Sequence, residues 1–256
     1  MDKQYYFDYY QAERKHWFFK ARNRIIMQHV ADLIKNKKDL KILNIGVATG
    51  HTSELLSEFG AVKSVEFDED CFEFTKKQCP QLDLIRGSIL ELPFEDSSYD
   101  IVCAFDVIEH IEDDATGVTE MQRVCKKGGN VVLTVPAFMS LWSHHDVINH
   151  HFKRYKKSEI KSLLTPNSNI VYLTYFNFFL FPPVWLFRKL NNLLGFTSKD
   201  KSKDDSAGSD LEMFKDKSII SKTLYSILSS ERPFIKRKVV MPFGVSVLAS
   251  WVKEIE

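Results

Sequence analysis

Four histidines gather in one short stretch of the chain. His144, His145, His150 and His151 fall within eight residues, together with Asp146. Imidazole changes its charge near neutral pH, so a histidine oriented by a carboxylate can accept a proton from a hydroxyl group. One interpretation is a general base, with His145 or His151 in that role and Asp146 orienting or replacing it. A metal site and a polar loop whose side chains cap turns are the alternatives. Because adjacent histidines seldom converge on one ion, we predict no metal.

A second group of residues has the spacing of a nucleotide site. The residues Asn44 to Gly50 read NIGVATG, follow an apolar run and precede a helical pattern. Glycines in such a turn let a ligand approach the backbone, and helix N–H groups point toward it. Glu66 lies 20 residues after Gly46, at the end of the next apolar run, where a carboxylate can accept hydrogen bonds from both hydroxyls of a ribose. The alternative for Glu66 is a solvated carboxylate at a strand end.

The elements that must position these residues alternate along the chain from Leu40 onward. We expect strands at 41–45, 62–67, 82–87, 98–106 and 128–136. Helices are expected at 53–60 (ending at Gly60), at 68–78, and from the fourth strand to about 124. This alternation implies right-handed βαβ units and a parallel sheet covered on both faces, with ligands bound at the carboxyl ends of the strands. The glycine turn, Glu66 and the histidine window are therefore expected at one edge.

The flanking segments extend this core. We expect one helix over 11–35, with an interruption as an alternative, helices at 158–164, 181–194 and 220–231, and strands at 169–176 and 244–253. The polar stretch 197–210 is predicted to be a flexible linker. The predicted organisation is an N-terminal helical lid (1–39), a ligand-binding core (40–180), a helical insertion containing the linker (181–238), and a final strand (239–256).

Composition restricts the class of protein. The 256 residues carry a net charge of +1, with 44% hydrophobic and 27% charged residues, which is typical of a globular protein and argues against a nucleic-acid binder. The four cysteines form no CxxC pair, and no basic segment followed by an apolar stretch indicates a secretory signal. No apolar run reaches the ~18 residues of a membrane span. We therefore expect a cytoplasmic protein.

Four further segments complete a pattern that is typical of one family. They are Gly87-Ser88-Ile89, LPFEDSSYDIV (92–102), AFDVIEHIED (104–113) and KKGGNVVLTVP (126–136). Together with the glycine turn, they resemble the class I S-adenosylmethionine-dependent methyltransferases, whose motifs read like DVGCGTG, GDA, LPFPDxSFD, VLEHV and LKPGG. The resemblance covers about 40–155. The flanking segments HWFFKARNRII (16–26), LWSHHDVINHHFKRY (141–155) and PFGVSVL resemble a bacterial branch found with surface-glycan biosynthesis genes.

The resemblance implies an α/β, Rossmann-like, doubly wound sheet of seven mostly parallel strands, with helices on both faces, an N-terminal helix and an insertion before the last strand. It implies S-adenosylmethionine as the cofactor. Three positions depart from the family pattern: Asn44 and Ser88 stand where acids are usual, and Ala48 replaces a glycine. Ala48 is tolerated if its φ is negative and strained if it is positive. The implied cofactor residues are Asn44, Gly46, Ala48 and Gly50 around the methionine part, Glu66 at the ribose, Phe67, Ser88 and Ile89 at the adenine, and Phe105 and Asp106 below the sulfonium.

The function implied is methyl transfer to a small-molecule or saccharide acceptor, most simply O-methylation, and the reaction itself requires no metal. Two alternatives stay open. A non-catalytic protein that binds S-adenosylmethionine or a nucleotide is suggested by Asn44 and Ala48. An NAD-dependent oxidoreductase is disfavoured by the Gly-x-x-x-Gly spacing.

Three surrounding features each have two interpretations. Lys153, Arg154, Lys156 and Lys157 either meet a phosphate or acidic sugar or form a solvated helix start. Trp17, Phe18 and Phe19 with Arg22 either form a lid over the cofactor or pack on the sheet, and His110 is expected to be structural. The aromatic segment 174–190 either contacts a membrane surface that carries a lipid-linked acceptor, or is buried on the domain or in a homodimer interface.

Overall fold

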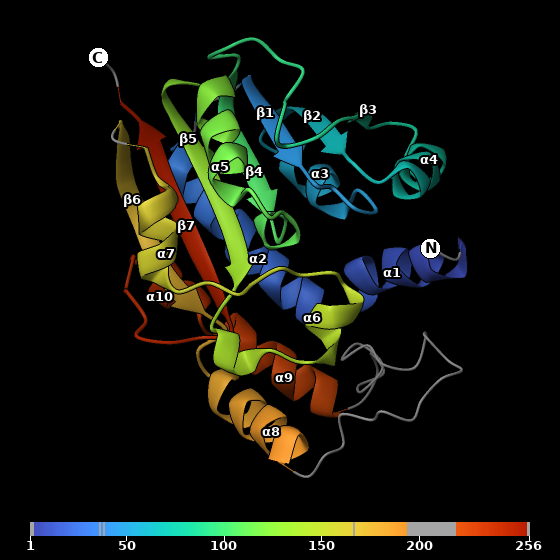
Figure 1. Ribbon diagram of the computed structural model, residues 1–256, viewed down its shortest axis with the longest axis vertical. Helices are drawn as coiled ribbons and strands as arrows, with labels where there is room; N and C mark the ends of the chain where they lie inside the picture. Colours follow the sequence, from blue (N-terminus) through green and yellow to red (C-terminus); the bar gives the residue numbers. More distant parts are fainter. Residues whose placement is uncertain (1–2, 36, 38, 166, 194–218, 255–256) are drawn as a thin grey trace.

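The computed structural model describes the chain except for residues 1–2, 36, 38, 166, 194–218 and 255–256. The predicted linker 197–210 lies outside the described residues. The remaining chain forms a seven-stranded sheet in the order β3-β2-β1-β4-β5-β7-β6, which confirms the predicted doubly wound fold (Figure 1). Only β7 runs antiparallel to its neighbours. The strands are β1 (Leu40–Ile45), β2 (Gly60–Glu66), β3 (Asp83–Arg86), β4 (Tyr99–Phe105), β5 (Cys125–Pro136), β6 (Ser168–Phe176) and β7 (Ser246–Lys253).

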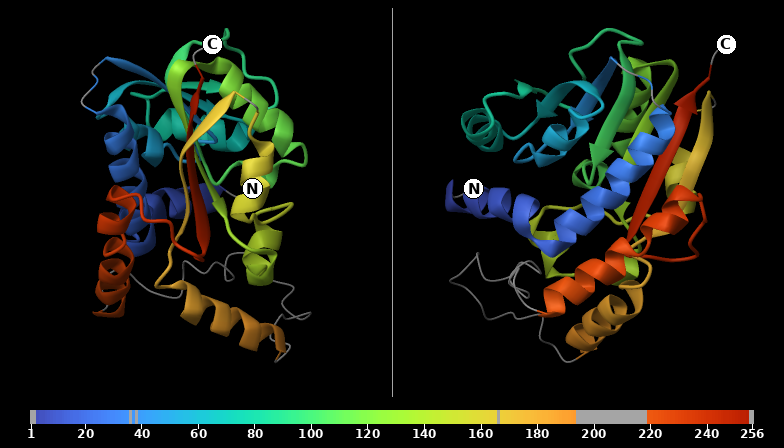
Figure 2. Two further views of the ribbon diagram at one scale, coloured as in Figure 1. Left: turned by 90° about the vertical axis from the view of Figure 1, so that its left-hand side faces the viewer. Right: turned by 180° about the vertical axis from the view of Figure 1, so that it is seen from behind.

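Helices cover both faces of the sheet (Figure 2). Side chains of neighbouring residues in a strand point to opposite faces, so Ile42 packs with α2, α3, α9 and α10, and Leu43 belongs to the cluster that contains α5 and α7. The helices are α1 (Lys3–Lys15), α2 (Trp17–Ile34), α3 (His51–Leu56), α4 (Glu69–Gln78), α5 (Asp114–Val124), α6 (His144–Ile148), α7 (Lys157–Leu163), α8 (Phe181–Leu193), α9 (Ile219–Ser229) and α10 (Arg232–Lys236), with short 3-10 turns η1 (Ile108–His110) and η2 (Met139–Leu141).

The N-terminal helix is divided at His16. The side chain of His16 accepts a hydrogen bond from the Phe18 N–H at 3.3 Å, which caps the start of α2. The chain therefore changes direction between α1 and α2, and only α2 lies along the sheet. Ala21, Ile25 and Val30 of α2 are fully buried there.

Gly60 is not the helix terminus that the sequence predicted. α3 ends at Leu56, and Gly60 opens β2 opposite Leu40 of β1. A Cβ atom at this position would lie 2.2 Å from the Leu40 carbonyl oxygen. Gly60 is thus required by the close approach of two backbones, and this requirement is not readable from the local pattern.

Among the described residues, three helices lie between β6 and β7, in the segment predicted to be an insertion. α9 and α10 pack against α2, with Leu228 and Ile235 buried in the same cluster as Ile25. α8 instead presents Leu186, Phe187 and Leu190 to the surface. Among the described residues, no helix combines the length and the apolar character that crossing a membrane requires.

Candidate functional site

The glycine turn and the end of β2 meet at the carboxyl edge of the sheet, to which the parallel strands point in Figure 1. The backbone N–H of Ala48 donates to Oε2 of Glu66 at 2.9 Å. Gly46 and Gly50 have φ values of +65° and +87°, which suit glycine. A Cβ on Gly46 would lie 2.5 Å from a methyl carbon of Val107. The structure therefore brings the predicted turn and the predicted carboxylate together.

Ala48 takes the positive-φ conformation, at +46°. The sequence allowed either a negative or a positive φ at Ala48. The positive value is the strained one, because an L-residue with a Cβ is disfavoured in the left-handed region. The Thr75 hydroxyl of α4 donates to the Ala48 carbonyl at 2.7 Å, and the Glu66 carboxylate accepts its N–H. Two tertiary hydrogen bonds thus hold this residue in place.

Asn44 lies beneath the turn and is almost fully buried. Its side-chain NH₂ group donates to the hydroxyls of Thr52 and Ser53 in α3, at 2.9 Å each. The hydroxyl of Ser64 in β2 donates to that of Ser53 at 2.8 Å. Asn44 therefore ties β1 to the helix that follows the turn.

Glu66 is buried, and its carboxylate is held by the backbone. Oε1 accepts from the N–H groups of Phe67 and Asp68, at 3.0 Å each, and Oε2 accepts from Ala48. Burial raises the pKa of Glu66, although these hydrogen bonds act in the opposite direction. The neighbouring Phe67 side chain is 71% exposed. An exposed aromatic ring beside such a carboxylate offers a stacking surface for a base.

The other predicted cofactor residues follow the neighbouring strands. Ser88 accepts a hydrogen bond from the Leu90 N–H at 3.1 Å. Ile89 is buried, and its side chain lies against Gly117 of α5, where a Cβ atom on Gly117 would be in van der Waals contact with it. Phe105, the last residue of β4, is buried. Asp106 follows it with a φ of +57°.

Arg22 of α2 reaches Asp106, a partner that the sequence did not identify. Its guanidinium lies 2.7 Å from Oδ2 of Asp106 and donates to the Thr134 hydroxyl at 3.0 Å. Thr134 in turn donates to Oδ1 of Asp106 at 3.0 Å. Arg22 is buried, whereas the Asp106 side chain is 40% exposed. This arrangement fixes the carboxylate at the end of β4 with one side open.

The segment that contacts the glycine turn is α1, not the aromatic start of α2. Trp17 and Phe19 are buried on the body of the domain. In α1, Glu13 accepts a hydrogen bond from the Thr49 hydroxyl, and Arg14 donates to the Thr49 carbonyl at 3.2 Å. Burial raises the pKa of Glu13 to about 7. Nothing in the apolar periodicity of α1 indicated these polar contacts.

The histidine window is organised around Asp146. Its carboxylate is completely buried and lies 2.9 Å from Nδ1 of His151 and 2.7 Å from Nε of Arg154. Although burial opposes ionisation, the hydrogen bond with His151 and the charge of Arg154 hold the pKa of Asp146 well below its usual range. The ring of His145 is 6.3 Å from that of His151, and its Nδ1 lies 3.2 Å from the amide nitrogen of Asn149. Of the two predicted bases, His151 thus has a direct hydrogen bond with Asp146.

The basic residues after His151 are largely engaged within the fold. Arg154 is buried against Asp146, Lys153 forms an ion pair with Asp114 at 2.6 Å, and the Lys157 amino group donates to the Met241 carbonyl at 3.3 Å. The solvated-helix interpretation of this segment was therefore wrong for Arg154. Its role as an anion ligand is also excluded in this conformation, because its guanidinium is buried.

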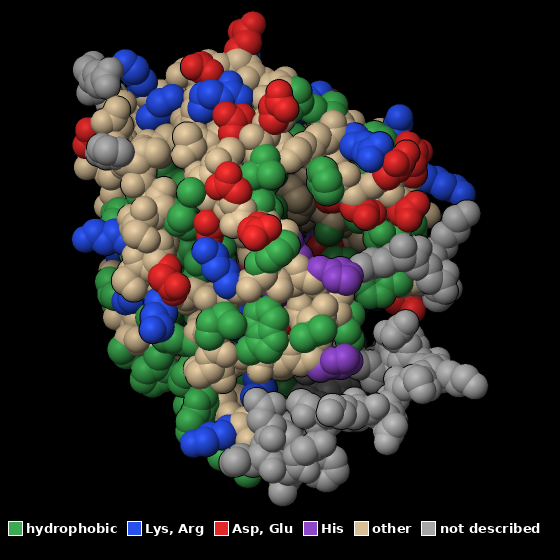
Figure 3. All heavy atoms as spheres, in the orientation of Figure 1, with side chains coloured by type: hydrophobic (Ala, Val, Ile, Leu, Met, Phe, Trp, Pro, Cys, Tyr) green, Lys and Arg blue, Asp and Glu red, His purple; other side chains and the backbone are tan. Residues whose placement is uncertain are grey.

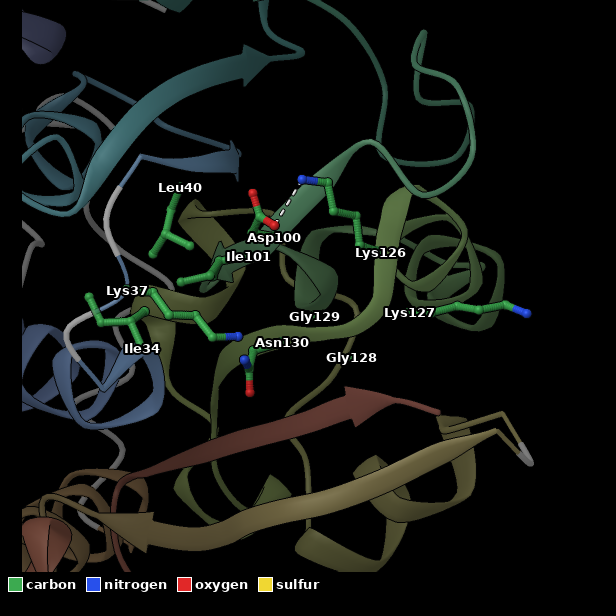
Figure 4. Close-up of a pocket in the computed structure, with 10 residues that line it drawn as sticks. All are labelled: Ile34, Lys37, Leu40, Asp100, Ile101, Lys126, Lys127, Gly128, Gly129 and Asn130. Atoms are coloured by element: carbon green, nitrogen blue, oxygen red, sulfur yellow. Dashed lines mark hydrogen bonds and ion pairs between the residues drawn. The ribbon is translucent and has the colours of Figure 1, made fainter. Parts of the chain in front are cut away.

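The edge that carries these residues is hollowed. Figure 3 shows a hollow on the right of the visible face, with acidic side chains on its rim and a histidine beside it. A separate pocket of about 100 Å³ lies at the opposite edge, where β1, β4 and β5 begin, and includes an Asp100–Lys126 ion pair of 2.8 Å (Figure 4). Ligands of doubly wound sheets bind at the carboxyl edge of the sheet. We therefore place the site at the hollow of Figure 3 and not at the pocket of Figure 4.

Comparison with known sequences shows similarity to methyltransferases over part of the chain. Residues 43–133 match the family described as a methyltransferase domain. A Mycolicibacterium smegmatis protein named "Probable S-adenosylmethionine-dependent methyltransferase" is 30% identical over 126 residues, which are 49% of this chain and 47% of that protein. Demethylmenaquinone methyltransferase of Staphylococcus epidermidis is 29% identical over 135 residues, covering 48% and 56%. The chain thus spans about half the length of these curated relatives.

Solved structures extend the likeness to most of the chain. Phosphoethanolamine N-methyltransferase 2 of Haemonchus contortus, in complex with S-adenosylmethionine, has a TM-score of 0.53 at 18% identity and covers 89% of this chain and 52% of its own. The fold is that of the class I methyltransferases. The YcgJ protein of Bacillus subtilis has a TM-score of 0.55 at 16% identity, covering 90% and 99%. The sequence matches and the solved structures thus agree in their similarity to S-adenosylmethionine-dependent methyltransferases.

A further solved structure shows that this fold does not by itself determine the reaction. The (4+2)-cyclase SpnF has a TM-score of 0.57 at 11% identity and covers 91% of this chain and 81% of its own. Since a cyclase shares the methyltransferase fold, the reaction must be argued from the residues at the site.

Proposed function

We propose that this protein transfers the methyl group of S-adenosylmethionine to an oxygen of a small-molecule or saccharide acceptor. The observation that supports the proposal is the Glu66–Ala48 hydrogen bond, because it joins the acid proposed for the ribose to the turn proposed for the methionine part of the same ligand. On this proposal Gly46, Ala48 and Gly50 border the methionine part, and Phe67 stacks on the adenine.

The roles of the remaining cofactor residues follow from their positions at or near the ends of strands. Ser88 and Ile89 meet the adenine, and Phe105 and Asp106 lie below the sulfonium. Asn44 acts through the turn, since its amide group is bonded to α3. Methyl transfer is an in-line displacement in which the protein chiefly aligns the reactants and excludes water.

At the acceptor end we assign His151, positioned by Asp146, in preference to His145. The Nδ1 atom of His151 is bonded to the carboxylate, so its Nε2 atom has the lone pair available to the acceptor. Asp146 is completely buried, too deeply to meet an acceptor itself.

The finer expectations remain proposals. A saccharide acceptor on a lipid carrier, a role in glycan biosynthesis and a cytoplasmic location are consistent with the segment resemblance alone. Peripheral membrane contact or a homodimer would each cover the apolar residues Leu186, Phe187 and Leu190 of α8, which are 52%, 44% and 46% exposed.

Calorimetric titration separates this function from its alternatives. We expect S-adenosylmethionine and S-adenosylhomocysteine to bind and NAD not to bind. Exclusive NAD binding would overturn the proposal in favour of an oxidoreductase. Binding of S-adenosylmethionine without transfer to any hydroxyl, phenol or saccharide in an acceptor panel would favour a non-catalytic binding protein.

A further inference from the structure

Two segments far apart in the sequence bring three possible ligands together after the carboxyl ends of β4 and β5. Glu109 and His110 lie in η1, directly after β4, and His151 follows α6. One donor atom from each lies within 4.8 Å of the others. Two imidazoles and one carboxylate form the donor set of mononuclear metal sites that keep positions open for a substrate.

Glu109 provides an independent reason to expect a ligand. The residue is fully buried, and among the described residues neither of its carboxylate oxygens has a hydrogen-bond partner. A buried carboxylate without partners is costly in free energy. A cation between Glu109 and the two histidines would satisfy its oxygens.

The histidines are oriented as metal ligands usually are. A ligating imidazole generally donates its other N–H group to a carboxylate or a carbonyl, which fixes the tautomer and the plane of the ring. His151 has this arrangement, because its Nδ1 atom is 2.9 Å from Asp146, and Nε2 is left to bind an ion. The His110 ring makes a main-chain hydrogen bond with Asn149 and stands edge-on to the His151 ring, with centroids 4.6 Å apart.

We propose that Glu109, His110 and His151 bind one divalent first-row transition-metal ion, and that this ion holds the oxygen of the methyl acceptor. The second part rests on the function proposed above. An acceptor hydroxyl bound to the ion has a lowered pKa and releases its proton to solvent. The oxygen then forms a bond to the methyl carbon as the carbon–sulfur bond breaks, and the electron pair of that bond stays on sulfur. In this scheme His151 is a metal ligand in place of the base assigned above, and Asp146 is its positioning residue.

The proposal revises the prediction of no metal. That prediction considered ions held by adjacent histidines within the window. In the structure, one histidine of the window, His151, lies beside Glu109 and His110 of a turn about 41 residues earlier. The two segments come together because β4 and β5 are neighbours in the sheet.

The test is a metal titration of the full chain after treatment with a chelator. We expect calorimetry to give one site per chain for Mn²⁺ and for Co²⁺, and Co²⁺ to show the visible absorption of a nitrogen-ligated ion. Glu109→Gln, His110→Ala and His151→Ala should each weaken binding at least ~10-fold. His144→Ala is the matched control, since His144 is an exposed histidine of the same window outside the cluster, and it should bind as the wild type does. Equal affinities in all five proteins would overturn the metal site.

Two further measurements keep this result distinct from the proposed function. Thermal unfolding shows whether each variant folds, and His110→Ala is decisive because His110 is exposed and its removal leaves no cavity in the core. Titration with S-adenosylhomocysteine tests the cofactor site separately. If cofactor binding fails while metal binding stands, the proposed function falls and the metal site does not. If methyl transfer continues unchanged with the metal removed, the acceptor role of the ion is overturned.

Discussion

The Glu66 carboxylate is bonded to the backbone N–H of Ala48, the residue at the centre of the glycine turn. A carboxylate offers about four acceptor positions, and here the N–H groups of Phe67, Asp68 and Ala48 occupy three. One position on Oε2 remains. On the role proposed for Glu66, a ribose that presents two hydroxyls would displace one backbone donor, and the Ala48 N–H is the donor that belongs to the turn. We therefore expect cofactor binding and the conformation of the turn to be coupled through this carboxylate.

Replacement of Glu66 should weaken the cofactor site. Glu66→Ala removes a charged acceptor, so we expect binding of S-adenosylmethionine to weaken by ~1–3 kcal/mol, or roughly 5- to 150-fold in Kd. Isothermal titration calorimetry measures this change. Glu69→Ala, which removes an acid from the nearby start of α4, is the control and should retain the wild-type Kd. Wild-type affinity in Glu66→Ala would remove Glu66 from the site.

Phe67 should matter for binding but not for folding. Its ring is largely exposed, so Phe67→Ala should leave the Tm nearly unchanged. Loss of stacking on the adenine should weaken S-adenosylhomocysteine binding by about 0.5–1.5 kcal/mol. Phe234→Ala, at a 38% exposed position on α10, serves as the control for loss of a surface ring. If the two variants bind the cofactor equally well, Phe67 does not contact the base.

Ala48→Gly should stabilise the protein. The positive φ of Ala48 costs an L-residue roughly 1–2 kcal/mol, and glycine avoids this cost at the expense of a more flexible unfolded chain. The expected net gain is about 0.5–1 kcal/mol in the free energy of unfolding, measured by urea denaturation. The same substitution at Ala115, an exposed position in α5, should destabilise by about the same amount. A loss of stability in Ala48→Gly would show that the positive φ costs less free energy than the added flexibility of the unfolded chain.

The alternation of strands and helices and the meeting of Gly46 with Glu66 were predictable because their evidence is local. Alternating apolar runs and helical patterns predict a doubly wound sheet, and in such a sheet Gly46 and Glu66 must lie at one edge. The break at His16 was one of two alternatives that the sequence allowed, whereas the role of Gly60 was not predictable, because it depends on a contact with another part of the chain. The Gly60 position in particular is decided by the backbone of Leu40.

Contacts between distant segments were missed for the same reason. Arg22 belongs by its pattern to an amphipathic helix, yet its guanidinium is bound to Asp106, 84 residues later. The burial of Glu109 also could not be predicted, because a glutamate after a strand is usually solvated. Charged residues placed in an otherwise apolar pattern were the one indication available.

Breaking the Asp146–Arg154 pair should be strongly destabilising. Both groups are buried, so Asp146→Asn leaves an unpaired guanidinium, and we expect a loss of about 3–5 kcal/mol in the free energy of unfolding. Removal of both charges, in Asp146→Asn with Arg154→Met, should recover part of that loss. Urea denaturation of the two variants provides the comparison. A single variant as stable as the wild type would show that the pair contributes only to positioning His151.

Stability should also fall at acid pH through His29. The ring is 1% exposed, and its Nε2 lies 2.9 Å from the Ser250 hydroxyl. Burial, with a smaller contribution from Lys238, lowers the pKa of His29 to about 4, against about 6.5 in the unfolded chain. The unfolded state therefore binds the proton first, and stability is full above pH 6.5 and decreases as the pH falls toward 4, by roughly 3 kcal/mol in total. His29→Gln, which keeps a hydrogen-bonding group without titrating, should flatten this part of the curve of unfolding free energy against pH. His144→Gln at an exposed position should retain the wild-type slope, and an unchanged slope in His29→Gln would assign the acid loss to other groups.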